Sequence, residues 1–335
     1  MMINALTFVR KHLIYLILIS MGLGLANGHF NQVGYLKSLI LPILLLMVLP
    51  MMVNIKIEEV LNAFKDFKPV GLSLAVNFIF MPVLALVVAW IFFQDQPIYA
   101  VGLYLVALLP TSGMTAAWTG MAKGNLNTAL VIIAVNLLLS IFILPLYLKF
   151  MVNQAVPFDP VHIFQQLLYI VVAPMLAGDL IRRLIVRRWG KEGYLKVKPH
   201  LSSISSLGVV LIIFLAMSLK AGRILGDLGA SALVLAPIVV FYFLAISAGL
   251  ILGRMFLARD KMIALVYGTA MRDLSIAVAI AMLSFPEAVM PIALAYAIQV
   301  PTAAVIMKVL LRLEKRRPRV AVGERLKSET SLIGS

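Results

Sequence analysis

The chain of 335 residues is 62% hydrophobic and only 13% charged, and its formal net charge is +15. A typical globular domain is about a quarter charged, so this composition excludes an ordinary soluble enzyme or binding domain. The absence of cysteine excludes a disulfide framework, a thiolate metal site and a cysteine nucleophile. The apolar residues gather in runs long enough to cross a hydrocarbon core of roughly 30 Å as helices. The predicted fold class is therefore an all-α polytopic membrane protein.

Apolar segments along the whole chain are predicted to span the membrane. The first follows two basic residues and is too long for the apolar region of a signal peptide. A polar stretch with helical spacing at 55–69 predicts a short cytoplasmic or interfacial helix. The ten expected spans lie near residues 11–27, 35–53, 69–93, 97–122, 127–150, 161–185, 200–220, 230–257, 261–284 and 288–312.

Lysine and arginine residues fall mostly on one side of this arrangement. With both termini inside, 24 of the 29 Lys and Arg residues lie in cytoplasmic segments, four lie outside, and Arg272 lies within a span. This bias predicts a multi-pass protein of the cell (plasma) membrane with cytoplasmic N- and C-termini, and it accounts for the net charge without a nucleic-acid partner. The expected division is spans one to six in 1–181, a basic cytoplasmic linker at 182–200, spans seven to ten in 201–312, and a basic tail at 313–335.

Prolines and helix breaks recur at corresponding places in two sets of five spans. Such inverted repeats with interrupted helices indicate the binding site of a secondary transporter. The matched positions are Pro82 with Pro237, Pro110 with the 268–273 region, and Pro145 with Pro301.

The fourth span is interrupted at Pro110, which has no backbone N–H to donate. Thr111, Ser112 and Thr115 follow it closely. In hydrocarbon, unwound backbone is tolerated only where it is buried in protein or lines a wet cavity. Freed carbonyls and hydroxyls can then bind a cation, while half-helix N-termini can bind an anion. The alternative is a proline kink whose hydroxyls bond to their own helix.

The ninth span contains Arg272 and Asp273 side by side, with Thr269 and Ser275 nearby. Charges at this depth cost roughly 2.5–3.5 kcal/mol and usually face a cavity or a partner. Adjacent residues of a regular helix point about 100° apart and cannot pair well, so the backbone is unwound or each charge has its own partner. We expect Asp273 to bind a proton or cation, Arg272 to anchor an anion or act as an internal counter-charge, and a polar cavity to surround both. A structural ion network is the alternative.

Single amides precede prolines in three further spans, at Asn77, Asn136 and Gln299. An amide oxygen can bind a cation or bond across helices. The four histidines do not cluster, so no metal site is expected, and there is no nucleotide-binding loop that would indicate ATP-driven pumping. No cofactor is expected beyond a coupling ion, H⁺ or Na⁺.

The motifs of spans three, four, nine and ten together resemble a known superfamily, that of bile acid:sodium symporters and arsenical-resistance (arsenite efflux) permeases. The similar stretches are VNFIFMPVLA, then Pro110, Met114, Trp118 and the Ala122-Lys123-Gly124 turn, then LSIAVAIA and IQVP. The resemblance implies ten helices in two inverted five-helix repeats. Spans three to five and eight to ten would form a core, the others a panel, and broken helices four and nine would cross at mid-membrane.

The sequence departs from both branches of this superfamily. Thr111 stands where arsenite permeases have a cysteine, and Asp273 falls where they have a glutamate, which implies an acidic cation or proton role. The bile acid branch's sodium-binding residues correspond to Val266, Ala270 and Ala116 here. Arg272 matches neither branch.

These features predict a secondary active transporter, not an enzyme, that moves a small organic anion by alternating access with H⁺ or Na⁺. The alternative is a metalloid permease that exchanges arsenite or antimonite for H⁺ without a cysteine. Outside transport, a membrane enzyme or sensor would need a catalytic dyad or a soluble domain. The expected partners are the solute, a coupling cation and the bilayer. The predicted solute- and ion-binding residues are Asn77, Thr111, Ser112, Thr115, Asn136, Thr269, Arg272, Asp273, Ser275 and Gln299.

Overall fold

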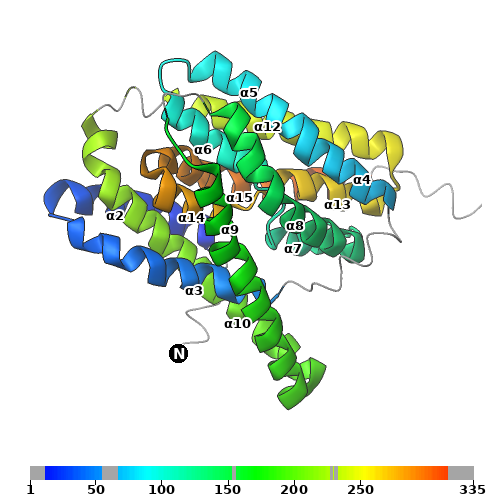
Figure 1. The fold of residues 1–335 in the computed structure, drawn as a ribbon. Coiled ribbons are helices and arrows are strands. Elements are labelled where there is room, and N and C mark those ends of the chain that lie inside the picture. Colours follow the sequence, from blue (N-terminus) through cyan, green and yellow to red (C-terminus); the bar gives the residue numbers. More distant parts are fainter. Residues whose placement is uncertain (1–11, 55–66, 153–155, 227–228, 230–232, 316–335) are drawn as a thin grey trace, which may run out of the picture.

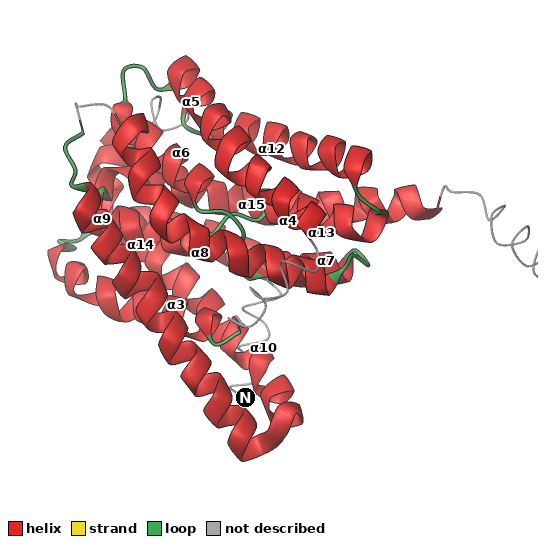
Figure 2. Cartoon of the chain, turned by 45° about the vertical axis from the view of Figure 1, so that its right-hand side comes forward, coloured by secondary structure: helices red, strands yellow, loops and turns green. Residues whose placement is uncertain are grey.

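A computed structural model describes the chain except for residues 1–11, 55–66, 153–155, 227–228, 230–232 and 316–335 (Figure 1). The described residues form helices joined by short loops and contain no strand (Figure 2). Most of the segment in which an interfacial helix was expected, and most of the basic tail, lie outside the described residues. The all-α prediction is confirmed.

The helices follow the expected spans closely in order and position. They are α2 (Leu13–Phe30), η1 (Gly34–Leu39), α3 (Ile40–Met52), α4 (Phe67–Ala75), η3 (Val76–Phe80), α5 (Met81–Phe92), α6 (Pro97–Leu108), α7 (Met114–Met121), α8 (Leu126–Met151), α9 (Pro160–Leu167), η4 (Leu168–Val172), α10 (Ala173–Gly226), α12 (Leu235–Phe256), α13 (Arg259–Ala270), α14 (Leu274–Ser284), η5 (Pro286–Ala288) and α15 (Val289–Lys315).

Seven helical segments of the described chain are long and apolar enough to cross a membrane, and Tyr15–Phe30 and Pro97–Leu108 are shorter apolar helices. Large apolar side chains cover the outside of the bundle: Trp90 is 70% exposed, Phe150 75% and Phe243 68%. Soluble monomers rarely expose so much continuous apolar surface. The chain is a multi-pass membrane protein.

The basic connection expected at 182–200 is helical. It lies inside α10, where the helical conformation is interrupted at Gly190 (φ 69°, ψ 179°). Arginine, lysine and leucine favour helix, so a polar segment of this composition continues the helix instead of forming a loop. The left-handed φ at Gly190, which glycine adopts without strain, turns the chain back, and Figure 1 shows the resulting helical hairpin.

Helices α2, α3 and α10 pack together on one side of the molecule (Figure 1). Gly24 and Gly28 make the contact between α2 and α10 very close: a Cβ atom at Gly28 would lie 2.0 Å from the carbonyl oxygen of Ser218. Small residues four apart allow this approach between membrane helices. On the other side, α13 and α14 are almost entirely buried among α4, α6, α8, α12 and α15.

Candidate functional site

Two interrupted helices cross inside the bundle. The pair α6 and α7 is broken at 109–113, and the pair α13 and α14 at 271–273. The residues that end the first half-helices have nearly equal backbone angles: Leu109 has φ −101° and ψ 84°, Met271 φ −92° and ψ 84°. The N–H of Ser112 donates to the Met271 oxygen at 2.8 Å, and the N–H of Asp273 donates to the Leu109 oxygen at 3.0 Å. The two breaks therefore satisfy each other's backbone groups.

The two breaks have different local causes. In the first, Pro110 lacks an N–H and Thr111 adopts a positive φ of 46°. A β-branched residue in this region is strained by about 1–3 kcal/mol, and such strain gathers at functional sites. In the second break no proline is present. Instead Asp273 caps α14, because its Oδ1 accepts from the N–H of Ile276 at 3.2 Å.

The Arg272 side chain is fully buried and lies at the ends of two half-helices. Its Nε donates to the Val106 oxygen at 3.1 Å, and its Nη2 donates to the Ala107 oxygen. Its Nη1 donates to Oδ1 of Asn77 at 2.5 Å and to the Thr269 oxygen at 3.4 Å. The prediction that a polar cavity surrounds Arg272 is therefore wrong for this residue, because protein oxygens surround its guanidinium. We call these four oxygen atoms the carbonyl cluster.

Four buried side-chain oxygens of the two interrupted helices have no hydrogen-bond partner among the described residues. They are Oδ2 of Asp273, Oγ1 of Thr111, Oγ of Ser112 and Oγ1 of Thr119. Asp273 is 1% exposed and forms no ion pair with the described part of the chain, although Arg272 is its neighbour. Burying polar atoms without partners costs several kcal/mol in an apolar medium. A carboxyl oxygen and hydroxyls left unpaired here form a candidate site for a solute or cation.

Asn77 and Asn136 lie beside the crossing and bond to each other. Asn77 Nδ2 is within 3.2 Å of the Ser73 hydroxyl, Oδ1 of Asn136 and the Gly268 oxygen. Asn136 Nδ2 donates to Ser73 at 3.1 Å and to the Ile132 oxygen at 2.8 Å. Both amides thus bond across helices, with Asn77 linking α8 to the interrupted α13 and to Arg272.

Gln299 fixes the backbone of Arg272. Its Oε1 accepts from the Arg272 N–H at 2.9 Å, and its Nε2 donates to the Arg272 oxygen at 3.2 Å. The hydroxyl of Tyr242 donates to the same Oε1 at 2.7 Å. The amide therefore bonds both backbone groups of Arg272 at the break.

The remaining predicted residues are buried, and their hydroxyls are bonded. Thr115 donates to the Tyr267 oxygen at 3.3 Å, which joins α7 to α13. Thr269 bonds within its own helix at 2.9 Å, and the Ser275 hydroxyl lies 2.8 Å from that of Tyr296. Of these three bonds, only that of Thr115 joins the two interrupted helices, while Thr111, Ser112 and Asp273 contribute unpaired oxygens.

Sequence reasoning missed Ser73, Tyr242 and Tyr296. Ser73 lies four residues before Asn77 on one helix face, which was a usable signal. The two tyrosines gave no signal in the sequence, because tyrosine is common in membrane proteins and these two follow no spacing pattern.

The turn after α7 attaches the first interrupted helix to the second. Lys123 has a φ of 60°, and the Gly124 N–H donates to the Thr119 oxygen at 2.8 Å. Asn125 bonds Asp260 at the start of α13 through its N–H at 2.9 Å and its side chain at 3.0 Å. The Ala122-Lys123-Gly124 stretch thus forms a helix-ending turn with a left-handed residue.

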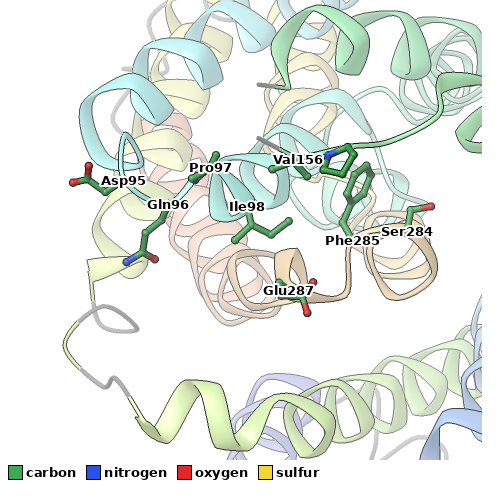
Figure 3. Close-up of a pocket in the computed structure, with 9 residues that line it drawn as sticks. Asp95, Gln96, Pro97, Ile98, Val156, Ser284, Phe285 and Glu287 are labelled. Atoms are coloured by element: carbon green, nitrogen blue, oxygen red, sulfur yellow. The ribbon is translucent and has the colours of Figure 1, made fainter. Parts of the chain in front are cut away.

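A cavity of about 510 Å³ lies away from the crossing, at the loops that join α5 to α6 and α14 to α15 (Figure 3). Asp95, Phe285 and Glu287 are among its lining residues, and none of the predicted site residues lines it. Glu287 also pairs with Lys220 of α10 at 2.8 Å. This ion pair joins the α2, α3 and α10 group to the helices that carry the crossing.

Comparisons with known proteins fit this arrangement. The sequence model of the Sodium Bile acid symporter family matches residues 41–227. The arsenical-resistance protein Acr3 of Corynebacterium glutamicum is 26% identical over 259 residues, 71% of this chain and 70% of that protein. The probable sodium/metabolite cotransporter BASS3, chloroplastic, of Arabidopsis thaliana is 22% identical over 213 residues, 64% and 48% of the two chains. The sodium/bile acid cotransporter 7 of Xenopus tropicalis is 27% identical over 198 residues, 56% and 54%.

Proposed function

The chain belongs to the Sodium Bile acid symporter family, and we propose that it is a secondary active transporter of a small organic anion, coupled to H⁺ or Na⁺. The observation that carries the proposal is the crossing of two interrupted helices beside the unpaired oxygens of Asp273, Thr111 and Ser112. Interrupted helices of this kind form the solute and ion sites of secondary transporters.

The proposed architecture has ten spans in two inverted five-helix repeats. The seven long segments and two shorter apolar helices support it, because the 63-residue segment Pro160–Gly222 contains the turn at Gly190 and holds two spans. The similar angles at Leu109 and Met271, and their exchanged hydrogen bonds, also support a two-fold relation. With both termini cytoplasmic, α2, α3, α9 and α10 form the panel and the other helices the core.

Asp273 is the proposed coupling residue. An ionised carboxylate buried without a partner is very costly, so the group is expected to hold a proton or a cation in its stable states. A negative solute beside an ionised carboxylate would be repelled, and a bound cation removes that repulsion. Solute and cation therefore favour each other's binding, which is the thermodynamic basis of coupled transport.

The proposed solute contacts are the Thr111 and Ser112 hydroxyls and the N-terminal end of α7, where the helix dipole favours negative charge. The donors of Arg272 are directed at protein oxygens. We therefore assign Arg272 the counter-charge role instead of the anion anchor. Asn77, Asn136, Thr115, Thr269, Ser275 and Gln299 position the crossing in this proposal.

A second candidate function is the exchange of arsenite or antimonite for H⁺. The 26% identity to an arsenical-resistance protein favours it, and unpaired hydroxyls can bond an uncharged hydroxylated metalloid. The chain contains no cysteine, so recognition would depend on these oxygens.

The test is transport in proteoliposomes under separately imposed H⁺ and Na⁺ gradients, with arsenite and a panel of small organic anions as solutes. Gradient-driven anion flux that is lost in Asp273→Asn supports the proposal. The matched control is Asp95→Asn, an exposed loop carboxylate, which should retain the flux. Proton-driven arsenite flux without anion flux supports the second candidate, and gradient-driven flux that survives in Asp273→Asn contradicts the role of Asp273.

A further inference from the structure

Arg272 occupies a position with the chemistry of a cation site. Its guanidinium is 0% exposed and meets the carbonyl cluster: the backbone oxygens of Val106, Ala107 and Thr269 and the side-chain oxygen of Asn77. No carboxylate of the described residues pairs with it. Neutral oxygens alone therefore hold a buried positive charge.

The origin of these oxygens explains why they attract a cation. Val106 and Ala107 lie in the last turn of α6, and Thr269 lies in the last turn of α13. Carbonyls of a last turn lack helical donors, and the end of the helix carries a partial negative charge. Two such ends converge on one point here. In transporters with broken helices, half-helix C-termini and unwound carbonyls are the groups that coordinate Na⁺.

We propose that Arg272 is a built-in cation that substitutes for an exchangeable ion between the ends of α6 and α13. This inference rests on the proposed transport function and deepens it. The position is filled in every state of the cycle, so ion coupling is left to Asp273 alone. A transporter built in this way moves at most the one cation that neutralises Asp273.

The surrounding bonds argue that Arg272 stays in place. Gln299 holds both its N–H and its carbonyl oxygen, and Asn77 is itself tied to Gly268 and Asn136. The side chain uses its Nε and both Nη atoms, so little donor capacity is left for a solute. Arg272 is accordingly a positioning and specificity-determining residue.

The experiment is cation rescue of Arg272→Ala, measured as the melting temperature of the purified protein in detergent. Choline chloride is the reference salt, and NaCl or methylguanidinium chloride replaces it at about 1–50 mM, well below the concentrations at which guanidinium salts denature proteins. We expect the variant to melt roughly 5–10 °C below the wild type in choline. Methylguanidinium should restore at least about half of that difference, while Na⁺ should restore a smaller part. The wild type should show neither response.

The matched control is Arg254→Ala, an exposed arginine at the end of α12, which should melt like the wild type in all three salts. Rescue that is equal in Arg254→Ala and Arg272→Ala, or a melting temperature of Arg272→Ala that is the same in all three salts, overturns the inference.

Arg272→Lys keeps the test decisive if the alanine variant does not fold. Lysine retains a cation within reach of fewer oxygens, so its melting temperature should fall below the wild type and should not respond to Na⁺. A Na⁺-dependent rise in Arg272→Lys would contradict a filled cation position. Because melting needs no transported solute, rescue without any flux would refute the proposed function alone, and flux without rescue would refute this inference alone.

Discussion

Replacing Asn77 by leucine should destabilise the protein more than the same change at Asn136, although both amides are fully buried. Asn77→Leu removes the 2.5 Å acceptor of Arg272 and the donor to the Gly268 oxygen. A hydrogen bond to a charged group contributes about 1.5–3 kcal/mol, and each neutral bond in a membrane protein about 0.6 kcal/mol. With the further neutral bonds to Ser73 and Asn136, the loss is about 3–5 kcal/mol. Asn136→Leu loses only neutral bonds, with Ser73 and its neighbours, or about 1–2 kcal/mol.

The assay is thermal melting of both purified variants at one scan rate, because membrane proteins commonly unfold irreversibly. At about 2 °C per kcal/mol for a chain of this size, Asn77→Leu should melt about 8 °C below the wild type and Asn136→Leu about 3 °C below it. In an Arg272→Ala background the two shifts should become similar, since the charged bond is already absent. Equal shifts in the wild-type background, or a shift of Asn77→Leu that is unchanged without Arg272, would refute the reasoning.

Three further outcomes follow from the packing and backbone. Gly28→Ala should lose about 1–3 kcal/mol of stability, because its Cβ would lie 2.0 Å from a backbone oxygen of α10. Gly22→Ala on the same helix, whose Cβ would meet nothing within 4 Å, should melt at or above the wild type. Equal melting temperatures of the two variants would contradict the close contact. Thr111→Gly relieves a positive φ of 46°, so it should gain about 1 kcal/mol and lose solute transport, and a lower melting temperature would argue against strain. Glu287→Ala removes the 2.8 Å ion pair to α10, worth about 0.3–1 kcal/mol at a partly exposed site. The rate at which a single cysteine at Ser112→Cys reacts with an impermeant maleimide should then rise about two- to fivefold. An unchanged rate would mean that this ion pair does not restrain the movement of α10 against the helices that carry the crossing.

Composition and hydropathy were sufficient to predict the helical class and the order of the helices, because an apolar segment in a membrane must satisfy its backbone hydrogen bonds within itself. The region 182–200 was harder to predict. Its charges indicated a connection between spans, but its residues also favour helix, and only Gly190 marks the reversal.

The candidate site was predictable as a set of residues and less so as a set of contacts. The adjacency of Arg272 and Asp273 indicated that the helix was unwound or that each charge had its own partner, and the helix is indeed broken at 271–273. The partners of Arg272 are mostly backbone oxygens, which carry no sequence signature, so the sequence could not choose between its two possible roles. The counter-charge role stays a proposal. The binding roles of the unpaired oxygens stay predictions.

The backbone hydrogen bonds between the two breaks also affect how fast their amide hydrogens exchange with water. Segments outside helices usually exchange quickly, because small local openings expose them. The amides of Ser112 and Asp273 lie in such segments, yet each donates to a carbonyl of the other interrupted helix. Their protons can exchange only when α6 and α13 separate, so they should be as slow as those of a helix centre. Fast exchange of either amide would therefore report that the two breaks come apart.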